Sequence, residues 1–340
     1  MYQIQNTRIN KVFHVVFMML LVLFGHAQQT ISYAEKLGWK KTDRVVILHV
    51  DDVGMSHDSN EGAIQAMTKG VANSCSVMMP CPWVPGFVQY MKTHPGIDAG
   101  LHLTLNAEWK QYRWGPLAGQ PAVPGLVDAE GAMWRSVPEV VQHATPEEVD
   151  REIRAQLERA VAMGFQPTHL DSHMGTLFAT PAFLSKYIQL GIEKKIPVML
   201  PGGHATLINE QMKFDNTAMQ QIRGIGAGLW NAGLPVLDDL FNLSYGWKLP
   251  AGVQPTDRNL QEFTTKQYIA GLKTLKPGVT MVIMHCTAPT EVFPHISDSG
   301  PTRKGDLLAM VDPALKAFIE KEGIILTTWR ELAERRRAIK

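Results

Sequence analysis

The chain has 340 residues, of which 45% are hydrophobic and 19% are charged, so it has enough apolar sequence to bury a large core. Its 33 Lys and Arg residues nearly balance its 32 Asp and Glu residues, giving a formal net charge of +1 at pH 7. This balance argues against a nucleic acid, an anionic membrane surface or another polyanion as the partner.

The first 27 residues have the features of a secretory signal peptide. Arg8 and Lys11 form a basic start, residues 12–24 are almost wholly apolar, and residues 25–27 (Gly-His-Ala) resemble a cleavage site. We expect cleavage after residue 27, a secreted or periplasmic protein, and no stable insertion in the membrane. A retained anchor is the alternative, and the apolar run is shorter than the ~20 residues that span a bilayer.

From residue 44 onward, short apolar runs of strand length alternate with longer amphipathic stretches. This alternation is typical of repeated β-α units around a parallel sheet, and it predicts an α/β fold. The predicted strands are residues 44–50, 74–79, 98–105, 168–170, 197–200, 279–284 and 324–327.

Helices are predicted between these strands, at residues 60–69, 146–163, 181–195, 265–275 and 313–322. The helix at 146–163 has the strongest pattern, since apolar residues recur every four positions after a Thr-Pro-Glu-Glu start that suits a helix N-terminus. Asn60 is the expected cap of the helix at 60–69. Residues 109–143 and 202–260 have no steady period, and we expect loops and short helices that cover one face. With no linker or repeat apparent, residues 28–43 are predicted to be a short lead-in and residues 44–340 a single domain.

Three cysteines occur in the chain, at positions 75, 81 and 286. An odd and small number does not suit a scaffold built on disulfides, so we expect three small buried apolar residues. A bridge between Cys75 and Cys81 is the alternative.

Polar clusters follow four of the predicted strands. Asp51 and Asp52 follow the first strand, and His102 interrupts the third. An alternating His169-x-Asp171-x-His173 ends the fourth, and His285 follows the strand at 279–284. We consider these clusters together as one candidate site. The carboxyl ends of parallel strands meet at one edge of the sheet, where active sites of β/α proteins lie. Neighbouring acids in a strand point in different directions, so Asp51 and Asp52 are expected to have separate roles. His285 suits a general acid or base because the pKa of histidine lies near neutrality.

Each cluster alone has a structural alternative. The acid pair also suits a helix cap or turn, His102 a hydrogen-bonded core histidine, and His285 an ordinary loop residue. His204, in a Pro-Gly-Gly-His sequence, suits either the site or a simple turn. Residues 303–306 (Arg-Lys-Gly-Asp) are expected to form a solvated loop.

Taken in order, four motifs resemble those of the YdjC family of carbohydrate deacetylases, which includes the chitooligosaccharide deacetylases. They are D-D-x-G at 51–54, G-x-H-x-x-L at 100–105, P-T-H-x-D-S-H at 167–173 and the strand-to-histidine turn at His285. The resemblance spans roughly residues 44–335.

The resemblance implies a distorted (β/α) barrel like that of polysaccharide deacetylases, and hydrolysis of the amide of an acetylated sugar or oligosaccharide. It implies that Asp52, His102 and His173 hold one divalent metal ion. It also implies that Asp51 is the base and that His285, as an imidazolium, is the acid beside the leaving amine. Zinc suits an Asp-His-His set by ligand softness, and the family is often described with magnesium, so we expect zinc with magnesium as the second choice.

Three departures from the family pattern concern residues beside these motifs. Met174-Gly175 stand where relatives often have further histidines, Cys286-Thr287 where Pro-Gly is common, and His49 where Asn is usual. They suggest a substrate that differs from those of relatives. Two other functions stay open: a metal-dependent amidohydrolase or esterase that acts on a non-sugar substrate, and a secreted carbohydrate-binding protein without turnover. The oligomeric state is also open, with a homodimer as one choice.

Overall fold

A computed structural model describes residues 31–339, and the predicted signal peptide at residues 1–27 lies outside them. Seven parallel strands form one sheet in the order β4-β3-β2-β1-β6-β5, in which β7 pairs with the first half of β1 and β2 with its second half. The strands are β1 (Arg44–Val53), β2 (Ser74–Val77), β3 (Ala99–Leu103), β4 (Leu170–Ser172), β5 (Asp239–Phe241), β6 (Gly278–Met284) and β7 (Ile325–Leu326).

Residues 198–201 link the two edges of this sheet through two isolated bridges. Val198 pairs with Leu170 of β4, and Pro201 pairs with Leu237 just before β5. The strands therefore curve around into a ring that closes only through single bridges. This arrangement confirms the predicted α/β fold with a distorted barrel of parallel strands.

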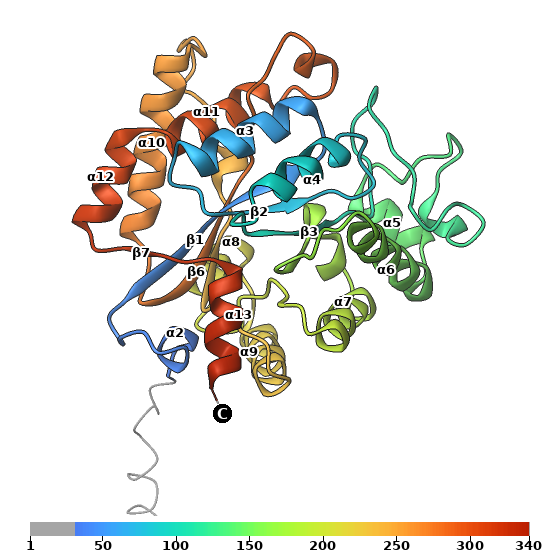
Figure 1. Ribbon diagram of the computed structural model, residues 1–340, viewed down its shortest axis with the longest axis horizontal. Helices are drawn as coiled ribbons and strands as arrows, with labels where there is room; N and C mark the ends of the chain where they lie inside the picture. The colour runs from blue at the N-terminus through green and yellow to red at the C-terminus, as the bar shows by residue number, and fades with distance from the viewer. Residues whose placement is uncertain (1–30, 340) are drawn as a thin grey trace, which may run out of the picture. The chain divides into compact units, whose positions relative to one another are not determined.

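Helices surround the strands (Figure 1). They are α2 (Tyr33–Lys36), α3 (His57–Thr68), α4 (Val84–Thr93), α5 (Val137–His143), α6 (Pro146–Ala162), α7 (Pro181–Lys194), α8 (Thr206–Met212), α9 (Asn216–Asn231), α10 (Asp257–Lys273), α11 (Gly300–Met310), α12 (Pro313–Lys321) and α13 (Trp329–Ala338). Four 3₁₀ turns are η1 (Pro124–Leu126), η2 (His173–Phe178), η3 (Ser244–Gly246) and η4 (Phe293–His295).

Helix α6 forms as its sequence predicts. The Thr145 hydroxyl accepts a hydrogen bond from the N–H of Glu148, whose carboxylate accepts one from the N–H of Thr145, and Pro146 occupies the first turn. This capping box satisfies N–H groups that have no partner within the helix. Val149 and Ile153 on its inner face are fully buried in the main core.

Several predicted boundaries were wrong. Ser56, not Asn60, caps α3, because the amide of Asn60 instead accepts from the N–H of Gly54 and donates to the carbonyl of Trp83. Helix α10 begins at Asp257 behind the cap Thr256, earlier than the predicted residue 265.

The segment 202–260 was also wrongly expected to hold only loops and short helices. It contains strand β5 and the 16-residue helix α9. Strand β5 was missed because the acids Asp238 and Asp239 interrupt its apolar pattern, although both are buried in the structure. Asp238 is accommodated because its carboxylate accepts three backbone N–H groups, from Tyr33, Ala34 and Val279.

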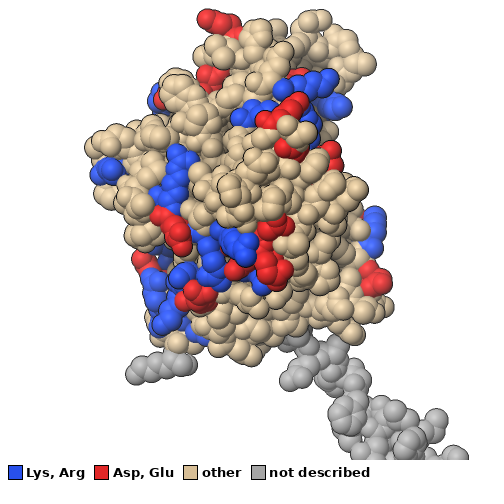
Figure 2. Space-filling model, turned by 90° about the vertical axis from the view of Figure 1, so that its right-hand side faces the viewer, with Lys and Arg blue, Asp and Glu red and all other residues tan. Residues whose placement is uncertain are grey.

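The compact body begins at Ser32, so α2 in the predicted lead-in is part of it. The three cysteines are free and buried, as expected. Within residues 31–339, no helix is both long and apolar enough to cross a membrane. Figure 2 shows one face of the molecule, on which basic and acidic side chains lie among one another. This mixture agrees with the near-zero net charge.

Candidate metal centre and active site

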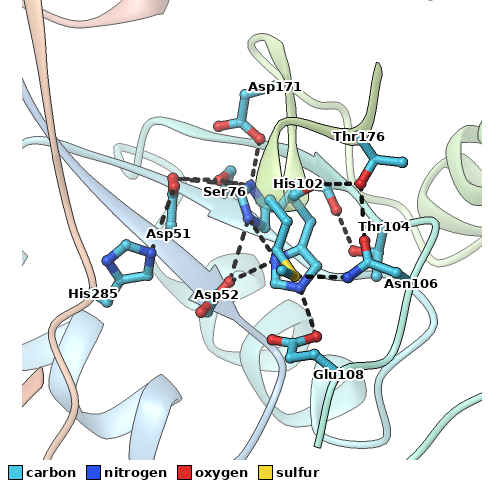
Figure 3. A network of polar contacts seen from close by, with 12 residues as sticks. Asp51, Asp52, Ser76, His102, Thr104, Asn106, Glu108, Asp171, Thr176 and His285 are labelled. Atoms are coloured by element: carbon cyan, nitrogen blue, oxygen red, sulfur yellow. Dashed lines mark hydrogen bonds and ion pairs between the residues drawn. The ribbon is translucent and has the colours of Figure 1, made fainter. Parts of the chain in front are cut away.

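The carboxyl ends of β1, β3, β4 and β6 bring all five predicted site residues together. Figure 3 shows Asp51, Asp52, His102 and His285 beside one another. Asp52 Oδ1 lies 3.3 Å from His102 Nε2 and 3.2 Å from His173 Nδ1. The two imidazole nitrogens lie 3.2 Å from each other. Three potential ligand atoms thus form a nearly equilateral triangle, and all three residues are buried.

This triangle fits a divalent cation. Ligand atoms about 2.1 Å from one cation lie roughly 3.0–3.4 Å from one another, depending on whether the geometry is octahedral or tetrahedral. Asp52 Oδ1 is buried and has no hydrogen-bond partner of acceptable geometry, despite its two histidine neighbours. Two imidazoles and one carboxylate are also a donor set that metals such as zinc use, with coordination positions left open for water and substrate.

A carboxylate lies against the far nitrogen of each imidazole. Asp171 Oδ1 is 2.7 Å from His102 Nδ1, and Glu108 Oε2 is 3.1 Å from His173 Nε2. Such carboxylates fix the ring orientation and increase the basicity of a ligating histidine. The sequence pattern includes Asp171, whereas Glu108 lies in an irregular segment and no periodicity indicated it.

The two oxygens of Asp51 have different surroundings. Oδ1 lies 3.1 Å from His49 Nε2 and accepts a hydrogen bond of 3.3 Å from Ser76 Oγ. Oδ2 faces His285 Nε2 at 4.0 Å. One oxygen is therefore anchored, and the other faces the side of the site where His285 lies.

Asp52 has a φ of 64°, in the left-handed region. This break in the extended backbone ends the strict alternation of side chains along β1. Asp51 and Asp52 can therefore approach the same centre and still contact different partners, in line with the expectation that they have separate roles.

Helix α11 contributes buried side chains that contact the site. The expectation that residues 303–306 form a solvated loop was therefore wrong. Arg303 is 2% exposed, and its NH2 nitrogen lies 2.7 Å from Asp52 Oδ2. One turn later, Asp306 accepts the N–H of His285 at 2.9 Å and the hydroxyl of Tyr268 at 2.7 Å. The polar side chains of this helix face inward, so its sequence looks like that of an exposed segment.

Comparison with known proteins assigns the chain to a family. The profile of the family described as YdjC-like protein matches residues 45–321. The chain belongs to the YdjC-like family. The resemblance inferred from its four motifs is thereby confirmed.

Named relatives of this YdjC-like chain cover most of its length. A protein from Thermus thermophilus named carbohydrate deacetylase is 29% identical over 298 residues, which are 86% of this chain and 94% of that protein. A protein from Klebsiella pneumoniae named chitooligosaccharide deacetylase is 24% identical over 302 residues, 85% of this chain and 100% of the other. A solved structure from Enterococcus faecalis V583, described as a candidate cellobiose-phosphate cleavage protein, has a TM-score of 0.68 and 18% identity, covering 86% of this chain and 99% of its own. That structural similarity shows a shared fold.

Burial and neighbouring charges shift the pKa values of Asp52 and His285 in the YdjC-like site. Burial opposes ionisation of Asp52, but the cation of Arg303 together with His102 and His173 outweighs this and holds the pKa of the carboxyl well below its usual range. Burial lowers the pKa of His285 to about 4, against the opposing effect of the Asp52 charge. The resting His285 is therefore neutral at pH 7.

Aromatic rings flank the centre on two sides. The ring of Tyr245, which is 46% exposed, packs edge to face on His285 at 4.9 Å. Trp109 lies 6.5 Å from the ring of His173, and the guanidinium of Arg303 is within 6 Å of both aromatic rings. His204 instead pairs with Asp239 at 3.2 Å, near the start of α8.

Proposed function

We propose that this YdjC-like protein is a metal-dependent carbohydrate deacetylase that hydrolyses the amide bond of an N-acetylated sugar. One observation carries the proposal: the buried triangle of Asp52, His102 and His173 lies beside Asp51, whose Oδ2 is not anchored. The names of the relatives, carbohydrate deacetylase and chitooligosaccharide deacetylase, support the substrate class.

We infer zinc as the metal from the chemistry of the donor set. Two imidazoles and one carboxylate favour zinc over magnesium, which prefers oxygen ligands. A divalent cation held there would polarise the acetyl carbonyl and lower the pKa of a bound water.

The chain's own residues then handle the protons. Asp51 is held through Oδ1, so Oδ2 is the oxygen that takes a proton from the water as it attacks the acetyl carbon. The C–N bond breaks, acetate leaves, and the sugar nitrogen needs a proton. Because the resting His285 is neutral, we assign this proton to the one that Asp51 took from the water: it passes from Oδ2, 4.0 Å from His285 Nε2, to the imidazole and from there to the departing nitrogen.

Acetate release from a panel of N- and O-acetylated sugars, together with metal analysis of the same preparation, tests this function. Asp51→Asn should lower turnover by about 100-fold or more while the metal stays bound, because a general base is lost and no ligand is. Asp52→Ala and His173→Ala should lose the metal. Asp43→Asn, just before the opposite end of β1, is the control and should change neither quantity.

The outcomes separate the proposal from its rivals. Full activity of Asp51→Asn would overturn the assigned base. Turnover of simple aryl acetates without any acetylated sugar would favour an amidohydrolase or esterase with another substrate. Bound metal and bound oligosaccharide without any turnover would favour a binding protein.

The proposed location is secreted or periplasmic, and it rests on the sequence of residues 1–27. N-terminal sequencing of the protein expressed in a bacterial host should give a mature chain that begins at Gln28. An intact Met1 on the exported protein would contradict cleavage.

A further inference from the structure

His49, on β1, is a fully buried histidine that contacts two carboxylates at once. Its Nε2 lies 3.1 Å from Asp51 Oδ1 and 3.0 Å from Asp171 Oδ2. Hydroxyls of β2 lie at the two ring nitrogens, with Ser76 Oγ 3.1 Å from Nε2 and Ser74 Oγ 3.0 Å from Nδ1. One ring therefore joins the acid beside the metal ligand Asp52 to the acid that holds the ligand His102.

The position of Nε2 determines where one proton lies. An unprotonated Nε2 would place its lone pair beside two carboxylate oxygens about 3 Å away, which is repulsive. Nε2 therefore carries a hydrogen, which it donates to Ser76 Oγ, while both carboxylates lie within ion-pair distance of the ring and Asp171 Oδ2 has no hydrogen-bond partner. Burial alone would lower the pKa of His49, but the carboxylates of Asp171 and Asp51 raise it to about 9, so Nδ1 is protonated as well and donates to Ser74.

Charge balance in the site agrees with a cationic His49. The carboxylates of the site are those of Asp51, Asp52, Asp171 and Glu108, and the buried guanidinium of Arg303 supplies one positive charge. A bound divalent cation would leave one negative charge uncompensated, which a buried site disfavours. An imidazolium at His49 offsets that charge, and the buried carboxylate of Asp306, whose pKa burial raises to about 6, adds one more negative charge at pH 7 that favours a cation nearby.

Other titratable neighbours of His49 do not supply that charge. His169 packs edge to face on His49 at 4.9 Å, and burial lowers the pKa of His169, which keeps it neutral. Cys75 lies between Ser74 and Ser76 on β2, and burial raises the pKa of its thiol well above the usual value, so it too is neutral.

We propose that His49 is a positioning residue, whose imidazolium bridges Asp51 and Asp171 and so fixes both the base and the ring of His102. This inference rests on the proposed deacetylase function for the role of Asp51. Through Asp51 Oδ1, His49 holds the carboxylate so that Oδ2 faces the substrate side. Through Asp171, it holds the carboxylate that orients His102 Nε2 toward the metal.

Two substitutions at this position separate its hydrogen bond from its charge and shape. The amide nitrogen of His49→Gln can occupy the place of Nε2 beside the two acids and donate to Ser76 Oγ, but it carries no charge. That of His49→Asn reaches only the place of Nδ1, beside Ser74. We expect His49→Asn to lower kcat by about tenfold or more with KM within about twofold, and to weaken zinc affinity by about tenfold through Asp171, whereas His49→Gln should recover part of both losses.

The charge itself is measured by ¹⁵N NMR of the zinc-loaded wild-type protein at pH 7.5. His49 should show two protonated ring nitrogens, while the ligands His102 and His173 have one nitrogen each on the metal. The His49 signals are assigned by their loss in His49→Asn or, if that variant does not fold, by their shift in Ser74→Ala. One unprotonated ring nitrogen at His49 would overturn the bridge.

The kinetic and zinc-affinity measurements can also contradict the proposal. Values of kcat and zinc affinity within twofold of wild type in both variants would remove the positioning role. Equal losses in His49→Asn and His49→Gln would also contradict it, because the retained donor would then make no difference. If the wild-type protein deacetylates nothing, the proposed function fails by itself, and the NMR and zinc-affinity measurements still decide whether His49 forms the bridge.

Discussion

Asp52 illustrates how single residues accept unfavourable conformations at this site. Its φ of 64° is one that side chains other than glycine rarely adopt, at a cost of roughly 1 kcal/mol or more. In return, one carboxylate reaches Arg303 with Oδ2 and the two histidines with Oδ1. Local backbone strain and the burial of charge thus serve the same three contacts.

The neutral state of His285 makes stability depend on pH. Its pKa is about 4 in the folded protein and near 6.5 in an unfolded chain. Between these values the unfolded state binds a proton that the folded state does not, so the free energy of unfolding falls on acidification. In protein stripped of metal by EDTA, His285→Asn should therefore gain roughly 2 kcal/mol relative to wild type between pH 7 and pH 5.

Urea denaturation of both proteins at the two pH values measures this difference, and it cancels the effect of every other titrating group that they share. Parallel changes in the wild type and in His285→Asn would mean that the imidazole is not held neutral.

Among the elements, α11 makes a contact whose energy should depend on the metal. Arg303→Met removes the guanidinium beside Asp52 Oδ2, and the loss of one partner of a buried ion pair costs about 3–5 kcal/mol in typical proteins. A bound divalent cation supplies the missing positive charge, so the loss should be much smaller in the zinc-loaded protein than in the EDTA-treated one. Denaturation in both conditions tests this.

A matched control for Arg303 is available on α10. Arg258 forms an ion pair with Glu262 in which both side chains are largely exposed. Arg258→Met should leave the free energy of unfolding unchanged, with or without zinc. An Arg303→Met loss of equal size in the two conditions would show that the guanidinium and the metal do not act on the same carboxylate.

Helix α3 packs on the loop after His285 through a glycine. A Cβ at Gly62 would lie 2.4 Å from Thr287 Cα and 2.5 Å from the carbonyl oxygen of Cys286. Gly62→Ala should therefore displace backbone beside His285 and destabilise the protein by about 1–3 kcal/mol, with a loss of kcat. Gly86→Ala in α4 is the control, since its nearest neighbours are at 3.9 Å, and it should gain about 0.5–1 kcal/mol in urea denaturation. Equal effects of the two substitutions would contradict the close approach.

The same elements show how far the sequence predicts this fold. β1, β6, α6 and α12 have an uninterrupted apolar run or period and were predicted nearly to their ends. Helix α9 was missed because it contains three glycines, and one of them, Gly226, is needed where the helix meets the backbone of Gly202. Helix α11 was missed because it buries Arg303 and Asp306 in place of apolar side chains.

The candidate site also contains residues that the sequence predicts and residues that it does not. Asp51, Asp52, His102, His173 and His285 were predicted to meet because each lies at the carboxyl end of a strand, and parallel strands place those ends together. Glu108 and Arg303 come from a loop and a helix, and only tertiary packing brings them to the centre. The roles of the five remain predictions, to be decided by the variants above.

At the scale of the whole molecule, a metal ion would join parts of the chain that are far apart in sequence. Asp52 belongs to β1, His102 to β3, and His173 follows β4, so the triangle forms only in the folded state. A ligand that binds the folded state alone stabilises it by about 2.7 kcal/mol at 100 times its dissociation constant. For a chain of this size, that gain corresponds to a rise in Tm of roughly 4 °C.

Thermal unfolding of EDTA-treated protein during a zinc titration should therefore show a Tm that rises with zinc concentration. Asp51→Asn should keep this rise, because Asp51 is not one of the three ligand atoms, while His173→Ala should lose it. Magnesium should give a smaller rise at the same concentration if the two imidazoles select zinc. A rise of the same size in His173→Ala would place the stabilising zinc elsewhere on the protein, and no rise in the wild type would mean that the triangle binds no zinc.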